Sequence, residues 1–299
     1  MVTGRFAPSP TGDLHLGNLR TALLAYHSVK SVGGRFLVRF ENLDRVTSSP
    51  EHARQQLADL ALIVVEPDEE SVFQSDRFHL YRDAISDLER RGLTYECYCS
   101  RKEIRDAVAA PHGDVAVYPG TCRELTEEQR SRKRSERPAA LRLRAEVFSH
   151  QFADAFCGSY EGQVDDVVLR RNDGVPSYNI AVVVDDAQQG VTEVVRGDDL
   201  LSITPTQIEL QRLLNLPSVT YRHVPLVYGA DGERLAKRHG AVTLRDLSTQ
   251  NGEVDDVVPE LRKASGLVNG IVNGTFSWDD VSRQPLVWNG SGFTVLGER

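Results

Sequence analysis

The stretch PSPTGDLHLGN, residues 8–18, places a histidine directly behind a loop rich in proline and glycine. A helix that begins after such a turn presents unpaired backbone N–H groups and the positive end of its dipole, and both favour anions. His15 can donate to a phosphate, Asn18 adds a donor, and Gly17 leaves room for a flat adenine ring. The stretch therefore predicts a polyphosphate site, and the alternative is a histidine that serves only the local structure.

Three cysteines have a spacing that suits a metal ion. Cys97 and Cys99 are separated by one residue, and Cys122 follows further along the chain. Three thiolates and one nitrogen or oxygen ligand complete a tetrahedral zinc site, and His112 is the ordinary choice because imidazole binds zinc more readily than a phenol. Buried free cysteines are also common, so packed thiols are the alternative. Cys157 lies outside this pattern and is predicted to be a packed thiol.

These residues need elements that position them, and from residue 4 to residue 99 the apolar pattern alternates between strands and helices. Ser48 or Ser49 before Pro50 is a helix start, and Gly92 ends a later helix. Such alternation predicts a parallel, doubly wound sheet. The expected elements are strands at 4–7, 35–41 and 93–99, and helices at 16–29, 50–60 and 77–91.

The alternation breaks after residue 99. Residues 100–175 hold the cysteine-bearing segment and several short alternating stretches, and are interpreted as an insertion. Strand-like runs return at 178–184 and 191–195, and a helix is expected at 204–214. From residue 243 onward, polar and Gly/Asn-rich stretches predict only a short helical stub.

Composition bounds the class of protein. The chain has 299 residues, with 40% hydrophobic and 26% charged residues, and no long apolar run, which is typical of a globular protein of two or three units without a membrane span. Its opening residues, MVTGRFAPSP, lack a basic region followed by an apolar one, so a cytoplasmic location is expected. The cysteines are then expected as thiols or metal ligands rather than disulfides.

The charge pattern bears on nucleic-acid binding. A net charge of -8 argues weakly against a chain coated in nucleic acid. A local basic run is present all the same, and it forms either a solvated face or an RNA contact. The run comprises Arg130, Arg132, Lys133, Arg134 and Arg137, with Arg142 and Arg144 shortly after it.

Four segments together resemble the class I aminoacyl-tRNA synthetases of the glutamyl type. GRFAPSPTGDLHLGN, at 4–18, is similar nearly residue for residue to the signature segment of that family, in which HLGN stands for the HIGH motif. The resemblance continues in FENLD at 40–44, in YNIAVVVDDAQQGVTEVVRGDDLL at 178–201, and in RLAKR at 234–238, which looks like the KMSKS loop. The segments follow the family order.

This resemblance implies an α/β fold. Its catalytic domain is a Rossmann-like doubly wound parallel sheet, carrying an inserted zinc-bearing α+β segment and a short C-terminal helical stub. The expected boundaries are 1–99 and 176–242 for the two halves of the catalytic domain, 100–175 for the insertion and 243–299 for the stub.

The resemblance also implies L-glutamate as a substrate. Its side-chain carboxylate needs a fixed cation, and arginine suits because its planar fork binds both oxygens. Arg5 and Arg196 are the candidates, since each lies at the end of a predicted strand, where ligands collect in open α/β sheets. By the resemblance, Glu41 takes the α-amino group and Tyr178 completes the pocket. The remaining glutamate contacts implied are Phe6, Ala7, Pro8 and Ser9.

Activation of glutamate requires its α-carboxylate to attack the α-phosphate of ATP and expel pyrophosphate. Such chemistry is mostly positioning and charge stabilisation. The resemblance assigns ATP binding to His15, Gly17, Asn18 and Lys237, and catalysis to His15 and Lys237. Mg²⁺ is expected with ATP, although no dedicated cage for it is evident.

Two residues depart from the family pattern. Asn42 stands where members often have aspartate, and Ala236 stands where the KMSKS loop has serine. The lost serine hydroxyl removes one contact that this loop could make on closing, worth about 1 kcal/mol.

The cysteine pattern also fits a branch of the family. CxC followed by YxxxC resembles the short glutamyl-synthetase paralogues, in which a tyrosine is the fourth ligand of a structural zinc ion. The resemblance therefore implies Cys97, Cys99, Tyr118 and Cys122 as ligands.

The length beyond the lysine loop points the same way. Only a short segment follows Arg238, too short for an anticodon-reading domain of ordinary size. This arrangement resembles the glutamyl-queuosine tRNA(Asp) synthetases, which activate glutamate without tRNA and transfer it to queuosine in the anticodon loop. The implied partners are glutamate, ATP and queuosine-bearing tRNA(Asp), with a monomer as the default state. The alternatives are a truncated glutamyl-tRNA synthetase charging a tRNA 3′ end, and a catalytically silent RNA-binding relative.

Overall fold

The computed structural model describes residues 1–100, 102–104, 117–235, 242–249, 254–267 and 276–296. Its centre is a five-stranded sheet in the order β10-β9-β1-β2-β3, and all of its strand pairs are parallel. The strands are β1 (Thr3–Phe6), β2 (Arg35–Phe40), β3 (Val72–Phe73), β9 (Glu193–Gly197) and β10 (Thr220–Val224). The predicted α/β fold with a parallel sheet is thereby confirmed.

The strand order changes direction between β1 and β9. From β1 the chain adds β2 and β3 on one side, and β9 and β10 on the other. In open α/β sheets, ligands bind beyond the carboxyl ends of the strands at such a switch point. Arg5 on β1 and Arg196 on β9 therefore occupy the two strands that border the expected ligand site.

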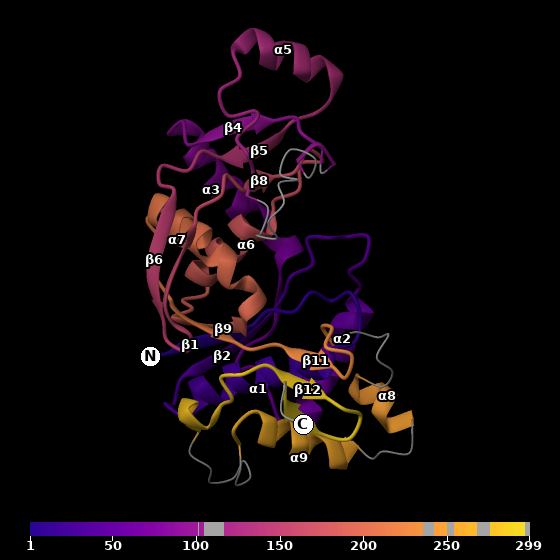
Figure 1. Cartoon of the computed structure of the whole chain (residues 1–299). Coiled ribbons are helices and arrows are strands. Elements are labelled where there is room, and N and C mark those ends of the chain that lie inside the picture. The colour runs from indigo at the N-terminus through magenta and orange to yellow at the C-terminus, as the bar shows by residue number, and fades with distance from the viewer. Residues whose placement is uncertain (101, 105–116, 236–241, 250–253, 268–275, 297–299) are drawn as a thin grey trace.

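Helices cover both faces of this sheet. Figure 1 shows α1 and α9 on one side of it and α6 and α7 on the other. The predicted helices are present as α1 (Leu16–Lys30), α2 (Pro50–Leu62), α3 (Phe78–Arg90) and α7 (Thr204–Leu213). The Ser49 hydroxyl caps α2, as the Ser-Pro-Glu sequence predicts. In the described part of the chain, no helix is long and apolar enough to cross a membrane.

The strand predicted at 178–184 is wrong, because these residues lie in the helix α6 (Tyr178–Gln188). The run IAVVV is buried between α3 and α7 on most sides, so its apolar residues show no helical stripe. A short, fully buried helix and a buried strand have the same apolar pattern. Gly190, at φ +66°, ends the helix in a left-handed conformation that glycine adopts without strain.

The inserted region forms two further sheets. The strand predicted at 93–99 exists as β4 (Thr94–Cys97), but it pairs antiparallel within the inserted region instead of joining the parallel sheet. Its partner β5 (Ala140–Leu143) also pairs with β8 (Val168–Arg170). A hairpin of β6 (Ser149–Asp154) and β7 (Gly158–Gln163) follows β5. The helix α5 (Glu127–Glu136) lies at the far end of the molecule from α9 (Figure 1).

The C-terminal region is more than the predicted helical stub. It contains α8 (Leu244–Thr249) and α9 (Val254–Ala264), but also two strands, β12 (Leu286–Trp288) and β13 (Phe293–Val295). These strands pair with β11 (Val227–Gly229), which follows the central sheet directly. Strands this short carry no readable period, so only their pairing with β11 reveals them.

Candidate functional site

A cavity of about 730 Å³ opens beside β1, β9 and the start of α1. Every described residue that was predicted to bind glutamate or ATP lines it. These residues are Arg5, Phe6, Ala7, Pro8, Ser9, His15, Gly17, Asn18, Glu41, Tyr178 and Arg196. Lys237 lies outside the described residues, and so does Ala236.

His15 caps helix α1 at one edge of the cavity. Its Nδ1 accepts from the backbone N–H of Asn18 at 3.2 Å, and the Asn18 Oδ1 accepts from the backbone N–H of His15 at 3.3 Å. Burial lowers the pKa of His15 to about 4, so the ring is neutral at pH 7. Because Nδ1 is an acceptor, the ring proton resides on Nε2, which is the donor left for a ligand.

Gly17, in the first turn of helix α1, lines the same cavity. A Cβ atom at this position would lie 3.0 Å from atoms of the His15 ring and 3.4 Å from Cβ of Val227. Glycine therefore keeps the floor of the cavity open next to the imidazole. The backbone of α1 is accessible here to a flat ligand.

The described residues on both sides of the lysine loop meet this site. Arg234 and Leu235 line the cavity before the loop, and Arg234 pairs with Asp199 at 3.0 Å. After the loop, the carbonyl of Val242 accepts from the backbone N–H of Leu16 at 2.9 Å. The described residues that flank positions 236–241 thus lie at this cavity and at the HLGN turn, although they belong to a distant part of the sequence.

A buried charge network lies under the cavity, between the sheet and α6. Asp186 accepts from Nη1 of Arg39 at 2.8 Å and from Nε of Arg5 at 3.2 Å. Burial alone would raise the pKa of Asp186, but Arg5 and Arg39 outweigh it and hold the pKa below its ordinary value. Arg39 is fully buried, and three nearby carboxylates raise its pKa against the effect of burial. Both cations are therefore compensated by α6.

Glu41 has the opposite balance. Its Oε1 lies 3.5 Å from Nη2 of Arg39, yet this buried atom accepts no hydrogen bond from a described residue. Burial raises the pKa of Glu41 to about 7, although Arg39 and Arg5 act against the shift. A buried carboxyl group that lines a cavity and lacks a donor is suited to a cationic group brought by a ligand.

Arg196 is anchored differently from Arg5. Its Nε donates to Nε2 of His223 at 3.0 Å, and its Nη2 donates to Oγ1 of Thr204 at 2.7 Å. Both acceptors are neutral groups, and Arg196 forms no ion pair with any carboxylate in the described ranges. The cavity therefore contains a guanidinium whose charge is not compensated by a direct partner, which favours an anionic ligand group.

Several positioning residues were missed by sequence reasoning. Gln56, on α2, is buried and donates to the carbonyls of Ser9 at 3.1 Å and Gly12 at 2.7 Å, so it holds the loop before His15. Asp186 contacts Arg5, and Arg39 contacts Glu41, so these two residues hold side chains that line the cavity. Arg39 lies in the predicted strand 35–41 and Asp186 in the family-like segment 178–201, but the residues next to them in the sequence do not indicate that either contacts the site.

The three predicted cysteines converge at the end of β4, together with the predicted tyrosine. Sγ of Cys99 lies 3.6 Å from Sγ of Cys122, and Oη of Tyr118 lies 3.4 Å from Cys97 Sγ and 3.5 Å from Cys99 Sγ. A tetrahedral zinc ion with ordinary bond lengths separates two sulfur ligands by about 3.8 Å and a sulfur from an oxygen by about 3.5 Å. The donor set therefore fits a closed, four-ligand zinc site, while His112 lies outside the described residues.

The cluster shares its proton unequally: the pKa of Cys97 is raised to about 12, mainly by its hydrogen bond with Cys122. A hydrogen bond from Cys97 is the main cause that lowers the pKa of Cys122 to about 6, so this thiol is close to the thiolate that zinc requires. The predicted packing of Cys157 is wrong, since this residue is exposed on the β6–β7 turn. Cys157 and the three clustered cysteines therefore form a matched comparison.

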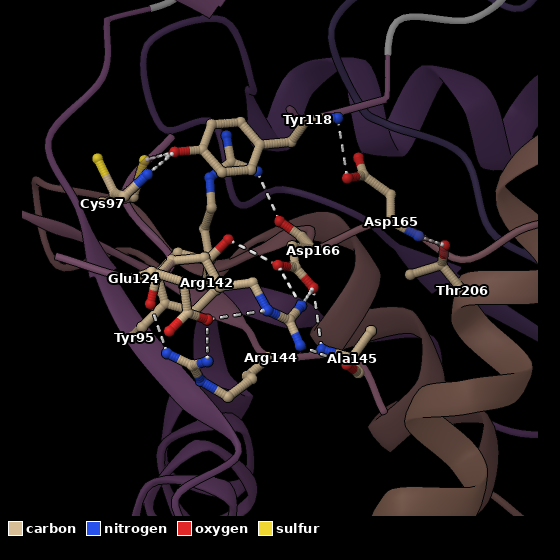
Figure 2. A network of polar contacts seen from close by, with 12 residues as sticks. Tyr95, Cys97, Tyr118, Glu124, Arg142, Arg144, Ala145, Asp165, Asp166 and Thr206 are labelled. Atoms are coloured by element: carbon tan, nitrogen blue, oxygen red, sulfur yellow. Dashed lines mark hydrogen bonds and ion pairs between the residues drawn. The ribbon is translucent and has the colours of Figure 1, made fainter. Parts of the chain in front are cut away.

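A polar network ties this cluster to the rest of the molecule (Figure 2). The backbone N–H of Tyr118 donates to Asp165 at 3.0 Å, and the backbone N–H of Asp165 donates to Thr206 of α7 at 2.9 Å. The guanidinium of Arg142 lies over the Tyr118 ring, 3.7 Å from its centroid. Asp166 accepts from Tyr95 at 2.8 Å. The cluster is thus connected to α7, whose first residue, Thr204, contacts Arg196.

The basic run is divided between surface and interior. Helix α5 buries none of its side chains, which is compatible with both a solvated face and an RNA contact. Arg134 pairs with Glu96 at 2.6 Å and Arg137 with Glu103 at 2.9 Å, so part of the positive charge is compensated locally. Arg142, in contrast, is buried beside the cysteine cluster.

Removing one clustered cysteine is expected to abolish zinc binding. We expect Cys122→Ser to lose one zinc ion per chain and to unfold at a lower temperature, because three ligands cannot close the site and metal binding contributes to folding. Zinc content by elemental analysis and thermal unfolding measure this. Cys157→Ser is the control and should keep its metal, and equal zinc in both variants would contradict the assignment.

Comparisons with known proteins agree with this geometry. The chain matches the family described as tRNA synthetases class I (E and Q), catalytic domain, over residues 1–261. A glutamyl-Q tRNA(Asp) synthetase from Nocardia farcinica is 56% identical over 265 residues, which is 88% of this chain and 85% of that protein. A second one, from Symbiobacterium thermophilum, is 45% identical over 284 residues, which is 90% of this chain and 88% of that protein.

Solved structures share the fold. A glutamate-tRNA synthetase from Elizabethkingia anophelis superposes with a TM-score of 0.79 at 24% identity, covering 97% of this chain and 68% of that one. A glutamate tRNA ligase from Elizabethkingia meningosepticum, solved in complex with its amino acid, gives a TM-score of 0.74 at 26% identity, covering 93% of this chain and 63% of that one. The chain that carries this site thus belongs to the class I tRNA synthetases (E and Q), within the ligase family of glutamyl-Q tRNA(Asp) synthetases.

Proposed function

We propose that this protein activates L-glutamate with ATP to glutamyl-adenylate in the absence of tRNA, and then transfers glutamate to the queuosine base in the anticodon loop of tRNA(Asp). Its relatives from Nocardia farcinica and Symbiobacterium thermophilum, which are glutamyl-Q tRNA(Asp) synthetases, support the acceptor. The main observation that supports the first step is that one cavity contains both Arg196, which has no carboxylate partner in the described ranges, and Glu41, whose Oε1 accepts no hydrogen bond from a described residue. A zwitterion with an additional carboxylate is complementary to these two groups.

The residues have distinct roles in this proposal. Glu41 receives the α-ammonium group, and Arg196 with Arg5 receives the side-chain carboxylate, which leaves the α-carboxylate free to attack the α-phosphate. His15 donates from Nε2 to a phosphate oxygen and thereby stabilises the charge that develops there. Lys237 is assigned the same task from the opposite side. ATP carries Mg²⁺ as a substrate complex, and pyrophosphate leaves. In the second step a hydroxyl of the queuosine cyclopentenediol attacks the acyl carbon of the adenylate, an ester forms and AMP leaves.

The remaining predicted contacts shape the pocket. Phe6, Ala7, Pro8 and Ser9 form its wall, and burial raises the pKa of Tyr178, which keeps its hydroxyl protonated as a donor. Gly17 and Asn18 lie under the nucleotide. A zinc ion held by Cys97, Cys99, Tyr118 and Cys122 has a structural task, because four protein ligands leave no position for a reacting water.

The acceptor is tested with three RNAs. Labelled glutamate and ATP are incubated with the protein and with queuosine-containing tRNA(Asp), queuosine-lacking tRNA(Asp) or tRNA(Glu). We expect label only on the first, and glutamate-dependent pyrophosphate exchange without any tRNA. Label on tRNA(Glu) would indicate a truncated glutamyl-tRNA synthetase instead. Absence of exchange would favour a catalytically silent RNA-binding relative.

A further inference from the structure

A buried chain of polar groups runs from the inserted hairpin to the cavity. Asp154, the last residue of β6, lies 2.6 Å from Nδ1 of His223 on β10. On the other side of the ring, Nε2 of His223 lies 3.0 Å from Nε of Arg196 and 3.0 Å from Oγ1 of Thr204. Both Asp154 and His223 are almost completely buried, and neither lines the cavity. The proposed chemistry leaves them without a role.

The contacts determine where the ring proton resides. Asp154 can only accept, because it is ionised: burial would raise its pKa, but the bonds from His223 and from the backbone N–H groups of Cys157 and Phe156 hold it below the ordinary value. Nδ1 of His223 must therefore carry a hydrogen. Burial lowers the pKa of His223, so the ring is neutral and Nε2 has a lone pair. That lone pair accepts from Arg196.

This arrangement fixes Arg196 without neutralising it. The fork formed by Nε and Nη2 is occupied by two neutral acceptors, His223 and Thr204. Nη1 makes no hydrogen bond to any residue within the described ranges, so the end of the guanidinium remains for a ligand. A carboxylate in place of His223 would also orient the side chain, but it would cancel the charge that attracts an anionic ligand.

We infer that His223 and Asp154 are positioning residues: by presenting a lone pair at Nε2, they orient Arg196 for the side-chain carboxylate of the amino acid. The inference rests on the proposed function, because it takes glutamate as the ligand of Arg196. It extends the site by two elements, β10 and the inserted hairpin. The hairpin thus contributes to the amino-acid pocket through Asp154, although none of its residues lines the cavity.

The variant Asp154→Asn tests whether Nε2 of His223 must present a lone pair to Arg196, because it changes the hydrogen bonding of residue 154 with little change in its shape. Oδ1 of Asp154 accepts from three backbone N–H groups, those of Phe156, Cys157 and His223, at 2.9, 2.8 and 3.3 Å, so the amide oxygen of asparagine must take that place. The amide NH₂ then faces Nδ1 and donates to it. The ring proton moves to Nε2 and points at Nε of Arg196, which is also a donor. The two donors repel, and Arg196 loses its orientation.

The kinetic test uses glutamate-dependent pyrophosphate exchange. We expect Asp154→Asn and His223→Leu to raise the KM for glutamate at least tenfold while the KM for ATP stays within twofold. His223→Gln should be milder than His223→Leu, because its amide oxygen can replace Nε2 as an acceptor. The control is His150→Gln, which breaks a similar histidine–carboxylate contact of 2.9 Å to Glu209, away from the cavity. It should leave both KM values unchanged.

A spectroscopic test is independent of turnover. In protein with ¹⁵N-labelled histidine, protonated and unprotonated ring nitrogens differ widely in chemical shift, and the His223 signals are those missing from His223→Gln. We expect the proton on Nδ1 in the natural protein and on Nε2 in Asp154→Asn. A natural protein with the proton on Nε2, or an Asp154→Asn variant with the natural KM for glutamate, would overturn the inference. Natural protein without exchange activity would instead contradict the proposed function, and the nitrogen shifts would still decide the orientation of the ring.

Discussion

Asp186→Ala is expected to lower the free energy of unfolding by about 3 to 5 kcal/mol, which is the usual cost of removing one partner from a buried ion pair. Asp186 contacts both Arg5 and Arg39, and these cations would remain buried in a site that has lost one of its carboxylates. The remaining carboxylates, Asp185 and Glu41, lie 3.6 Å and 3.5 Å from Arg39 and cannot replace the contact to Arg5. Urea unfolding measures the change.

The same variant has a pH signature. The pKa of Asp186 is lower in the folded protein than in an unfolded chain, so its contribution to stability is present above the ordinary carboxyl pKa and is lost as pH falls below that value. Asp186→Asn should therefore flatten the acid side of the stability profile. Asp83→Ala, at an exposed position of α3, is the control and should change the unfolding free energy by less than about 0.5 kcal/mol. An Asp186→Ala variant as stable as this control would show that the buried charge network does not contribute to the free energy of unfolding.

Glutamate binding is expected to weaken as pH falls below 7, by about fivefold in the first pH unit and by about tenfold in each further unit, since only the ionised form of Glu41 can pair with an ammonium group. Burial raises the pKa of Glu41 to about 7, so at lower pH most free protein carries a neutral carboxyl group there. Binding must then expel a proton, and the apparent KM for glutamate should rise about 16-fold between pH 7 and pH 5.5. Above pH 7.5 it should be constant.

Two comparisons isolate Glu41 in this profile. Glu41→Gln should bind glutamate weakly at every pH and lose the slope, because the amide does not titrate. The KM for ATP in the natural protein should change little over the same range, since the pKa of His15 is lowered to about 4 and its ring stays neutral. A glutamate KM that is constant from pH 7.5 to pH 5.5 would contradict the role of Glu41.

The sequence determined those helices and strands whose apolar residues recur with a regular period or whose ends carry a capping signal. Helix α1 begins at Leu16 and helix α2 at Pro50, as the HLGN turn and the Ser-Pro-Glu start predict. Strand β2 was also predicted within one residue. These elements follow from side-chain spacing and capping, which are properties of neighbouring residues. Residue type and spacing indicated the three cysteines, the HLGN residues and the two arginines, and the resemblance added Tyr118 and the other glutamate and ATP contacts. In the structure, all of these residues that are described converge at two places.

Only the tertiary structure decided the rest. Residues 178–188 are a helix because α3 and α7 bury them from several sides, which removes the helical stripe from the sequence. Strand β4 joins the antiparallel sheet because its partner β5 comes from the inserted region. The spacing of apolar residues indicates that a segment is buried, but it does not indicate which other segment packs or pairs with it.

The same limit holds for the site. Arg5 and Arg196 were found from their residue type and strand ends, but Asp186 and His223 were not, because each acts through another side chain that is far away in the sequence. Asp154 and Arg196 are linked only where β6, β9 and β10 fold together. The sequence by itself indicated which groups line the cavity. The tertiary structure decided their charge and orientation, since burial and hydrogen-bond partners exist only when distant segments pack.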